Sequence, residues 1–322
     1  MTTALTTDAR IRVPLVCGAM YPCSNPELVG AVSAAGGIGI IQPIALTYVH
    51  GHEFRAGVRL AQTMAAGTPI GFNALIEQSN AYYRRRMEEW ITVALEEGIR
   101  FFITSLGNPR WVVDRVSQVG GVVYHDVTAL KWALKGRDAG VQGLIAVNNR
   151  AGGHAGDTSA EMLLDELRPV GLPVVCAGGI GTPQDFRRVM DLGYAGAQLG
   201  TRFIATTECS ASEDYKRAIL DATAKDIVLS ERLTGVPVAV INNSYVRRLG
   251  LKAGPLARWM LRGRKTKHWM RTIYALRSLR QLKRDLTVDS GREEYWQAGQ
   301  SVDGIHEVLP AGKIVSDFEA AL

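Results

Sequence analysis

The sequence predicts an α/β protein folded as a single (β/α)8 TIM barrel with a helical extension after it. Short β-branched runs alternate with helical stretches up to about residue 205, and eight such runs can be counted. Each run is apolar on both faces, as expected of parallel strands that are covered by helices on their outer side. Eight strand–helix repeats in about 200 residues are typical of a closed barrel.

The predicted strands and helices follow one another in strict order. Stretches such as 80–98 are amphipathic at helical spacing, and most helical stretches end at a glycine. The helices are expected over residues 26–36, 55–67, 80–98, 109–120, 128–140, 159–171 and 182–193. The strands are expected over residues 13–20, 37–43, 69–75, 100–106, 121–127, 143–147, 173–179 and 195–201.

A doubly wound open sheet is the alternative to the barrel. Such a sheet usually carries a G-x-G-x-x-G dinucleotide fingerprint after its first strand. The end of the first predicted strand and the residues after it read CGAMYP (17–22), which does not fit that pattern. The closed barrel is therefore favoured.

Two regions are expected, a barrel core over residues 1–209 and a helical extension over 210–322 that packs on the barrel or covers it as a lid. The net charge of +6 comes from one part of the extension. The segment 247–284 holds 13 Lys and Arg and no Asp or Glu, which leaves 24 basic against 31 acidic residues elsewhere. The basicity therefore belongs to that segment and not to the whole surface.

Composition narrows the class of protein. The four cysteines form no CxxC pair, and the pair His50 and His52 has no third ligand at a suitable spacing, so no metal site is expected. No window reaches the roughly 18 apolar residues of a membrane span, and the first residues lack the apolar run of a signal peptide. We expect a soluble, cytoplasmic protein without a nucleic-acid-binding fold, and a homodimer is one open alternative for its assembly.

The seventh and eighth predicted strands end in two glycine turns, namely Gly178–Gly179 and Gly200–Thr201. Barrels of this type commonly bind a phosphate at the carboxyl ends of these two strands. Glycine lets backbone N–H groups approach an anion closely, and the start of a following helix favours negative charge. The pair predicts a phosphate cradle; tight turns without a ligand are the alternative for either motif alone.

His154 lies after the sixth predicted strand, in the loop AGGHAG (151–156). Its small neighbours do not bury it, so its imidazole can project into a cavity. An ordinary histidine pKa near 6.5 suits a general acid or base at neutral pH. We predict a catalytic role, with a purely structural histidine as the alternative.

Together these motifs resemble the nitronate monooxygenase (2-nitropropane dioxygenase) family. The resemblance rests on CGAM (17–20), AGGHAG (151–156), CAGGIG (176–181), GAQLGTRFIATTEC (196–209) and GQSVDGI (299–305), in the family order over nearly the whole chain. FMN-dependent enoyl-ACP reductases share the scaffold and the G-G-H motif. The resemblance therefore implies FMN and the barrel fold more firmly than it implies a substrate.

The resemblance also implies roles at matching positions. Gly18, Ala19 and Met20 would approach the flavin ring with their backbone amides. Asn73, at the end of the third strand, would lie beside the ring or the ribityl chain.

Both glycine turns would hold the 5′-phosphate. Gly299, Gln300 and Ser301 would fold back from the extension to close the cofactor site. His154 would stand over the flavin as the base that removes an α-proton, or would orient an anionic substrate.

One position departs from the family pattern. Many relatives have a lysine at the end of the fifth strand, where this chain has Asp126. A carboxylate there would not stabilise a negatively charged reduced flavin. His125 is a candidate for supplying part of the missing positive charge.

Three functions remain open from the sequence. The first is oxidation of alkyl nitronates or nitroalkanes with dioxygen to carbonyl compounds and nitrite. The second is an NAD(P)H-dependent flavin reductase that acts on an enoyl-CoA or ACP thioester or on a quinone. The third is a non-redox barrel enzyme for a phosphorylated substrate, for which only Asp126 and Asp157 are candidate carboxylates.

The basic segment 247–284 is open to several interpretations. Apolar residues recur at helical spacing in this segment, which predicts a helix with one packed face and a solvated basic face. They are Trp269, Ile273, Leu276 and Leu279. As a functional surface, the segment would dock the phosphates of coenzyme A or acyl carrier protein. A membrane surface is a third alternative.

Overall fold

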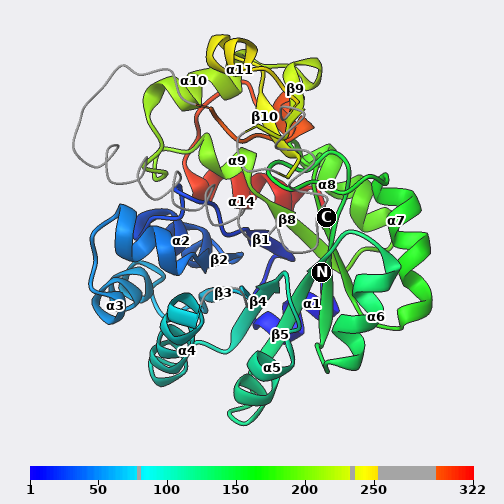
Figure 1. The fold of residues 1–322 in the computed structure, drawn as a ribbon. Coiled ribbons are helices and arrows are strands. Elements are labelled where there is room, and N and C mark those ends of the chain that lie inside the picture. Colours follow the sequence, from blue (N-terminus) through cyan, green and yellow to red (C-terminus); the bar gives the residue numbers. More distant parts are fainter. Residues whose placement is uncertain (78–80, 233–235, 253–294) are drawn as a thin grey trace.

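The computed structural model describes residues 1–77, 81–232, 236–252 and 295–322. Its centre is a closed barrel of eight parallel strands in sequential order, surrounded by helices (Figure 1). The predicted (β/α)8 barrel is confirmed, and each predicted strand contains one observed strand. The strands are β1 (Leu15–Cys17), β2 (Ile38–Ile41), β3 (Gly71–Leu75), β4 (Phe101–Ser105), β5 (Val122–Val127), β6 (Gly143–Val147), β7 (Val174–Ala177) and β8 (Gly196–Leu199).

Helices follow the strands in the expected alternation. The α-helices are α1 (Ala4–Ala9), α2 (Pro26–Ala34), α3 (Phe54–Met64), α4 (Ala81–Glu96), α5 (Arg110–Ser117), α6 (Leu130–Asp138), α7 (Ala160–Leu167), α8 (Pro183–Asp191), α9 (Thr201–Ile204), α10 (Glu213–Asp221), α11 (Ser244–Leu249) and α14 (Ala311–Ala320). Shorter helical turns are η1 (Ala45–Val49), η2 (Arg168–Val170), η3 (Ala224–Asp226) and η4 (Gln300–Gly304).

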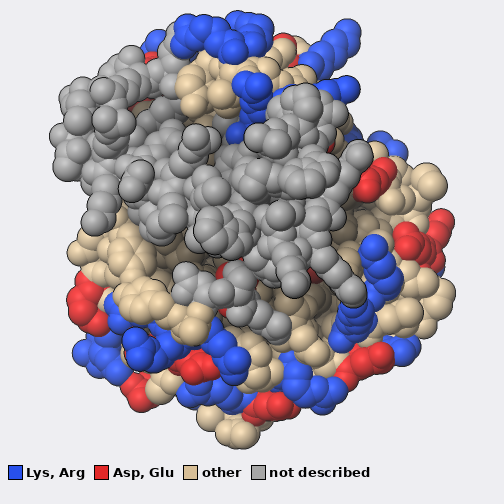
Figure 2. All heavy atoms as spheres, viewed as in Figure 1, with Lys and Arg blue, Asp and Glu red and all other residues tan. Residues whose placement is uncertain are grey.

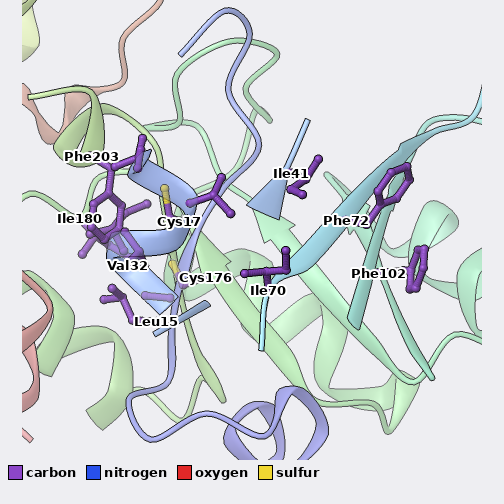
Figure 3. Close-up of a cluster of buried hydrophobic side chains, with 14 of the residues drawn as sticks. Leu15, Cys17, Val32, Ile41, Ile70, Phe72, Phe102, Cys176, Ile180 and Phe203 are labelled. Carbon is purple, nitrogen blue, oxygen red and sulfur yellow. The ribbon is translucent and has the colours of Figure 1, made fainter. Parts of the chain in front are cut away.

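Alternation along each strand divides the core into two layers. Val16, Phe101 and Tyr124 belong to the cluster inside the barrel, whereas Cys17, Phe72 and Phe102 belong to the cluster between strands and helices. Figure 3 shows members of this outer cluster, among them Phe72 and Phe102 of the strands and Val32 of α2. Both clusters are buried because adjacent residues of a strand point to opposite faces and both faces are covered.

The amino end of the barrel is covered by α1. Leu5 and Ala9 of this helix belong to the inner cluster, and an added Cβ at Gly196 would lie 2.4 Å from Cδ2 of Leu5. The hydroxyl of Tyr124, on β5, donates a hydrogen bond to Oδ2 of Asp8 at 2.9 Å. The N-terminal helix therefore packs against the barrel axis from below.

The extension is not purely helical. It contains the antiparallel strands β9 (Ile227–Ser230) and β10 (Val238–Ile241), and Figure 1 shows them grouped with α10 and α11 on one side of the barrel. The description of 210–322 as helical was incomplete because the runs IVLS and VAVI are β-branched strand formers that lie outside the barrel repeat. Farther along the chain, α14 packs on α2 and α8. The basic segment lies outside the described residues from position 253 onward.

Candidate active site at the carboxyl end of the barrel

The turns after β7 and β8 present backbone N–H groups without partners. The N–H groups of Gly178, Gly179, Gly200 and Thr201 have no hydrogen bond to any residue that the structure describes. Gly179 and Thr201 are buried, and buried N–H groups are almost always paired in folded proteins. An anion such as a phosphate would satisfy all four donors, so the donor set fits the predicted ligand.

Glycine is required at the first of these turns. Gly178 has φ +118°, and a Cβ there would lie 2.5 Å from Oδ1 of Asn148 and 2.6 Å from the backbone N of Ala151. Asn148 itself joins the loop after β6 to this turn, because its Nδ2 donates to the carbonyl of Gly178 at 3.0 Å. Its Oδ1 accepts from the backbone N–H of Arg150 at 2.8 Å. This asparagine, which the sequence analysis did not single out, fixes the cradle.

The helix dipole of α8 contributes less than the sequence predicted. The carboxylate of Asp185 accepts hydrogen bonds from the backbone N–H groups of Gly181 and Thr182, at 3.1 and 3.0 Å. The first turn of α8 is therefore occupied by its own capping box and is not free for a ligand. The pattern Thr182-Pro-Gln-Asp185 is the sequence signal for this cap.

The extension closes over the cradle. The backbone N–H of Gly299 donates to Oγ1 of Thr201 at 3.0 Å, and that of Gln300 donates to the carbonyl of Arg150 at 2.9 Å. A Cβ at Gly299 would lie 2.6 Å from the backbone N of Gly152, so the closing segment and the loop after β6 pack closely against each other. Ser301 is buried, and its carbonyl oxygen faces Gly181. All three closing residues therefore lie beside the two glycine turns.

A buried arginine holds this closing segment. Arg202, at 4% exposure, donates to the carbonyl oxygens of Ala205 and Glu307, at 2.8 and 2.7 Å. It thereby ties the start of α9 to the chain that follows η4. No pattern in the sequence marks this role for the arginine, although it stands in the motif after β8.

The loop that carries His154 is paired with the extension. Gly153 and Ala239 of β10 form an antiparallel bridge, with hydrogen bonds of 2.7 and 3.4 Å between their backbones. His154 is exposed to solvent. Enough protein still surrounds its imidazole for desolvation to lower its pKa below 6.5. No hydrogen bond joins its imidazole to another residue within the described ranges. The lowered pKa favours the neutral imidazole, and the ring is open to a ligand.

The loop after β1 has fewer free amides than expected. The N–H of Gly18 donates to the carbonyl of Leu199 at 3.0 Å, and that of Met20 donates to Oγ of Ser24 at 2.9 Å. Hydrogen bonding between β1 and β8 continues one residue further and a turn uses the amide of Met20, so two of the three amides are already bonded within the protein. The approach of these residues to the flavin ring stays a prediction. Only the N–H of Ala19 is left without a described partner.

Inward-facing polar side chains line the same end of the barrel. Asn73 pairs in register with Ile103 of the inner cluster; it lies within β3, two residues before the end of the strand, instead of at its end. Oε1 of Gln198 is buried without a partner, and this side chain packs against Gly18, where an added Cβ would lie 2.9 Å from its Cγ. Oδ1 of Asp126 is also buried without a partner. Such orphaned atoms fit a polar ligand in the barrel mouth.

His125 does not face this mouth. Its Nδ1 lies 2.8 Å from Oγ1 of Thr104, and its ring lies against Gly136 of α6, outside the barrel. Burial lowers its pKa to about 4, so the ring is neutral. The idea that His125 supplies positive charge to a flavin is wrong, since alternation along β5 points it away from the axis.

Other features of the described chain lie apart from this end. A cavity of about 510 Å³ lies at the opposite end of the barrel, between α1 and the loops that lead into β3 and β4. No helix in the described ranges is long and apolar enough to cross a membrane. Within the same ranges no group of three His, Cys, Asp or Glu side chains could hold a metal ion, and all four cysteines are buried and free.

The sequence and the fold were compared with known proteins. The family model described as nitronate monooxygenase matches residues 2–320. A curated relative from Mycobacterium tuberculosis is (3aS,4S,5R,7aS)-5-hydroxy-7a-methyl-1-oxo-octahydro-1H-indene-4-carboxyl-CoA dehydrogenase, 26% identical over 99% of this chain and 88% of its own length. A probable nitronate monooxygenase from Staphylococcus saprophyticus is 25% identical over 77% of this chain and 81% of its own.

Solved structures agree with the family match. A mutant of FabK from Thermotoga maritima has a TM-score of 0.80 and 25% identity, covering 99% of this chain and 96% of its own. The nitroalkane oxidase from Streptomyces ansochromogenes has a TM-score of 0.77 and 25% identity, covering 99% and 98%. The resemblance inferred from the motifs is confirmed: the chain is an oxidoreductase that belongs to the nitronate monooxygenase family.

Proposed function

We propose that the chain is an FMN-dependent oxidoreductase that oxidises alkyl nitronates, and nitroalkanes after removal of their α-proton, to carbonyl compounds and nitrite. The observation that carries the proposal is the set of four unpaired N–H groups after β7 and β8, next to the loop of His154. Family membership implies a flavin, and a phosphate site at this place suits the mononucleotide.

The residues divide the work between binding and proton transfer. The N–H groups of the two glycine turns, Gly178–Gly179 and Gly200–Thr201, would hold the phosphate. The segment from Gly299 to Ser301 would close over it. The loop after β1 and the side chain of Asn73 would border the ring. Bound FMN would supply the redox chemistry, by accepting electrons from the substrate and passing them to dioxygen.

His154 would act as the base toward a neutral nitroalkane. Its lowered pKa keeps a lone pair available at pH 7, and it accepts the α-proton of the carbon beside the nitro group. The bridge between Gly153 and Ala239 fixes the backbone on one side of this histidine. A preformed nitronate has already lost that proton, so it needs no base.

Substitution of His154 tests this role. His154→Asn should lower kcat/KM for neutral nitroalkanes by about 10²–10⁴-fold, the usual contribution of a general base, and spare most of the activity on preformed nitronates. The exposed His306, replaced by Asn, serves as the matched control and should change neither activity. Equal activity of the variant and the wild type on both substrates would rule out the assigned role.

The cofactor itself is tested without turnover. The purified protein should be yellow and should release one FMN per chain on denaturation. A colourless protein that takes up no FMN would overturn the proposal.

A second candidate substrate class is a CoA thioester. The M. tuberculosis relative, aligned with 99% of this chain, is named as a carboxyl-CoA dehydrogenase. Lys and Arg side chains gather near α11 in Figure 2, and α11 includes Arg247 and Arg248 and directly follows the strand that pairs with the His154 loop. These cations suit the phosphates of coenzyme A.

Anaerobic titration separates the two classes. A nitronate that bleaches the flavin, while acyl-CoA, NADH and NADPH do not, favours nitronate oxidation. Rapid bleaching by NADH or NADPH, followed by reoxidation with an enoyl-CoA, favours a reductase. Arg247→Glu combined with Arg248→Glu should weaken binding of a CoA ester and leave nitronate oxidation unchanged if α11 is the docking surface.

A further inference from the structure

Asp126 is a buried carboxyl group that points into the barrel mouth. It follows Tyr124 and His125 on β5, and strand alternation places it on the side of Tyr124, a member of the inner cluster. Its register partner on β6 is Ile145, also of the inner cluster. Its Oδ1 is buried and has no hydrogen-bond partner. Neither the family comparison nor the phosphate cradle explains this group.

No cation faces this carboxyl group from the strands that surround it. The inward neighbours on β4 are Ile103 and Ser105, and those on β6 are Ile145 and Val147. On β5 itself, the hydroxyl of Tyr124 is bonded to Asp8 at the other end of the barrel.

Among the described residues, the loops at this end hold further charged or titratable groups, namely Arg150, His154 and Asp157 after β6, Glu77 after β3 and Arg202 after β8. Burial, and none of these groups, raises the pKa of Asp126 to about 7. With no described counter-ion, the neutral acid is the favoured form below neutral pH.

A flavin held at the cradle would reach this position. Strands of a sheet lie about 4.8 Å apart, so β5 is about 10 Å from β7, where the phosphate turn begins. The ribityl chain of FMN separates its ring from its phosphate by five carbons, which is enough to cross that gap. Asp126 on β5 and the unpartnered Oε1 of Gln198 on β8 belong to strands three places apart around the eight-stranded barrel. A flat, polar ring spanning the mouth would meet both.

We propose that Asp126 contacts the flavin ring as a protonated carboxyl group and that loss of its proton selectively weakens the binding of reduced FMN. The proposal rests on the FMN site proposed above. It also replaces the expectation that an acid here opposes flavin reduction. A neutral carboxyl group can donate a hydrogen bond to the reduced ring, whereas a carboxylate would repel the negative charge of that ring.

The direction of the pH effect follows from charge. Two-electron reduction places negative charge on the pyrimidine part of the ring, whereas the oxidised ring is neutral. The protonated acid therefore favours reduced FMN, and the carboxylate disfavours it. Reduction raises the proton affinity of Asp126, so the ratio of reduced-FMN to oxidised-FMN affinity should fall as the pH rises above about 7.

The experiment measures this ratio between pH 7.5 and pH 9 under anaerobic conditions, from the midpoint potentials of bound and free FMN. In this range free reduced FMN is already anionic, and the lowered pKa of His154 keeps its titration below the range. In the wild type, the ratio should fall by up to about tenfold per pH unit, the limit for one linked proton. Asp126→Asn keeps the shape and a donor but does not titrate, so its ratio should be nearly independent of pH over that range. The exposed Asp157, replaced by Asn, is the matched control for surface charge and should retain the wild-type profile.

The outcomes separate the two proposals. Bound FMN with the same pH profile in the wild type and in Asp126→Asn would overturn the role of Asp126 and leave the FMN site standing. A chain that binds no FMN would overturn both. If Asp126→Asn does not fold, as judged by its unfolding transition, Asp126→Ser takes its place, with the same profile expected.

Discussion

The two ends of the barrel differ in how their polar groups are satisfied. At the amino end, α1 covers the axis with Leu5 and Ala9, and the hydroxyl of Tyr124 is bonded to Asp8. At the carboxyl end, four backbone N–H groups and the oxygens of Asp126 and Gln198 have no partner in the described chain. A buried polar group left unpaired costs about 1–3 kcal/mol, so the carboxyl end is the costly one.

This difference shows which end serves stability and which serves function. At the amino end, the contacts of α1 need no ligand and contribute packing to the free energy of unfolding. At the carboxyl end, the polar groups left unpaired in the described chain would be paired by a ligand that supplies acceptors and donors. Such a ligand would also stabilise the fold. Substitutions at the two ends should therefore have separable effects on stability and on FMN binding.

The largest effect is expected from Leu5→Ala. It removes a fully buried side chain at the amino end and should lower the free energy of unfolding by about 2–5 kcal/mol. Unfolding in urea, followed by circular dichroism, measures this loss, and FMN affinity of the folded protein should stay unchanged. A parallel fall in FMN affinity would show that the two ends are coupled.

The next effect is expected from Gly178→Ala. The new Cβ would lie 2.5–2.8 Å from Asn148 and Ala151, in a backbone conformation of φ +118° that alanine rarely adopts. Overpacking and strain of about 1–3 kcal/mol at the cradle should weaken FMN binding by roughly 5–100-fold.

Fluorescence titration of FMN checks this prediction, with Gly171→Ala as the control. Gly171 also has a positive φ, +76°, but no atom lies within 4 Å of its added Cβ and it lies after α7, away from the cradle. The control should lose stability and keep its FMN affinity. Equal FMN loss in both variants would contradict the role of the cradle.

A smaller effect is expected from Tyr124→Phe. It removes the hydrogen bond to Asp8 and should cost about 1 kcal/mol of stability, because Asp8 is only half-buried and regains water. Differential scanning calorimetry measures the shift, and the visible spectrum of bound flavin should not change. A changed spectrum would mean that the amino end senses the ligand.

The smallest effect concerns the pH dependence of proton abstraction. Because burial lowers the pKa of His154, its imidazole stays mostly neutral at pH 6.5, where an ordinary histidine would be half protonated. The kcat/KM for a neutral nitroalkane should therefore fall between pH 7.5 and pH 6.5 by less than the roughly 1.8-fold that an ordinary pKa of about 6.5 would give. Stopped-flow rates over that range test it, and a fall of about 1.8-fold or more would place the pKa at or above its ordinary value.

The sequence predicted the barrel well, and for a physical reason. Strands that are buried on both faces read as continuous apolar runs, and glycines mark the turns between strands and helices. The same reasoning located the glycine turns and the His154 loop. Orientation was harder: Asp126 and His125 are adjacent, yet one faces the mouth and the other faces α6.

The extension was predicted less well because its contacts are non-local. The bridge between Gly153 and Ala239 joins a barrel loop to β10. Neither of these two segments carries a local pattern that specifies the other as its partner. The capping box at Thr182 and Asp185 was visible as a motif and could have shown that α8 offers no free first turn. The unpaired N–H groups, in contrast, could be recognised only once every donor had been assigned.

The hydrogen bond between Gly299 and Thr201 has a consequence for the order of assembly. It joins residues 98 positions apart, so strand β8 leaves the ribosome well before the segment that completes the cradle. The long connection adds only a modest entropic cost to closure, because loop entropy grows slowly with length. On the proposed FMN site, cofactor loading would be a late event in the biosynthesis of this chain, because a nascent chain stopped before residue 299 lacks the segment that closes the cradle.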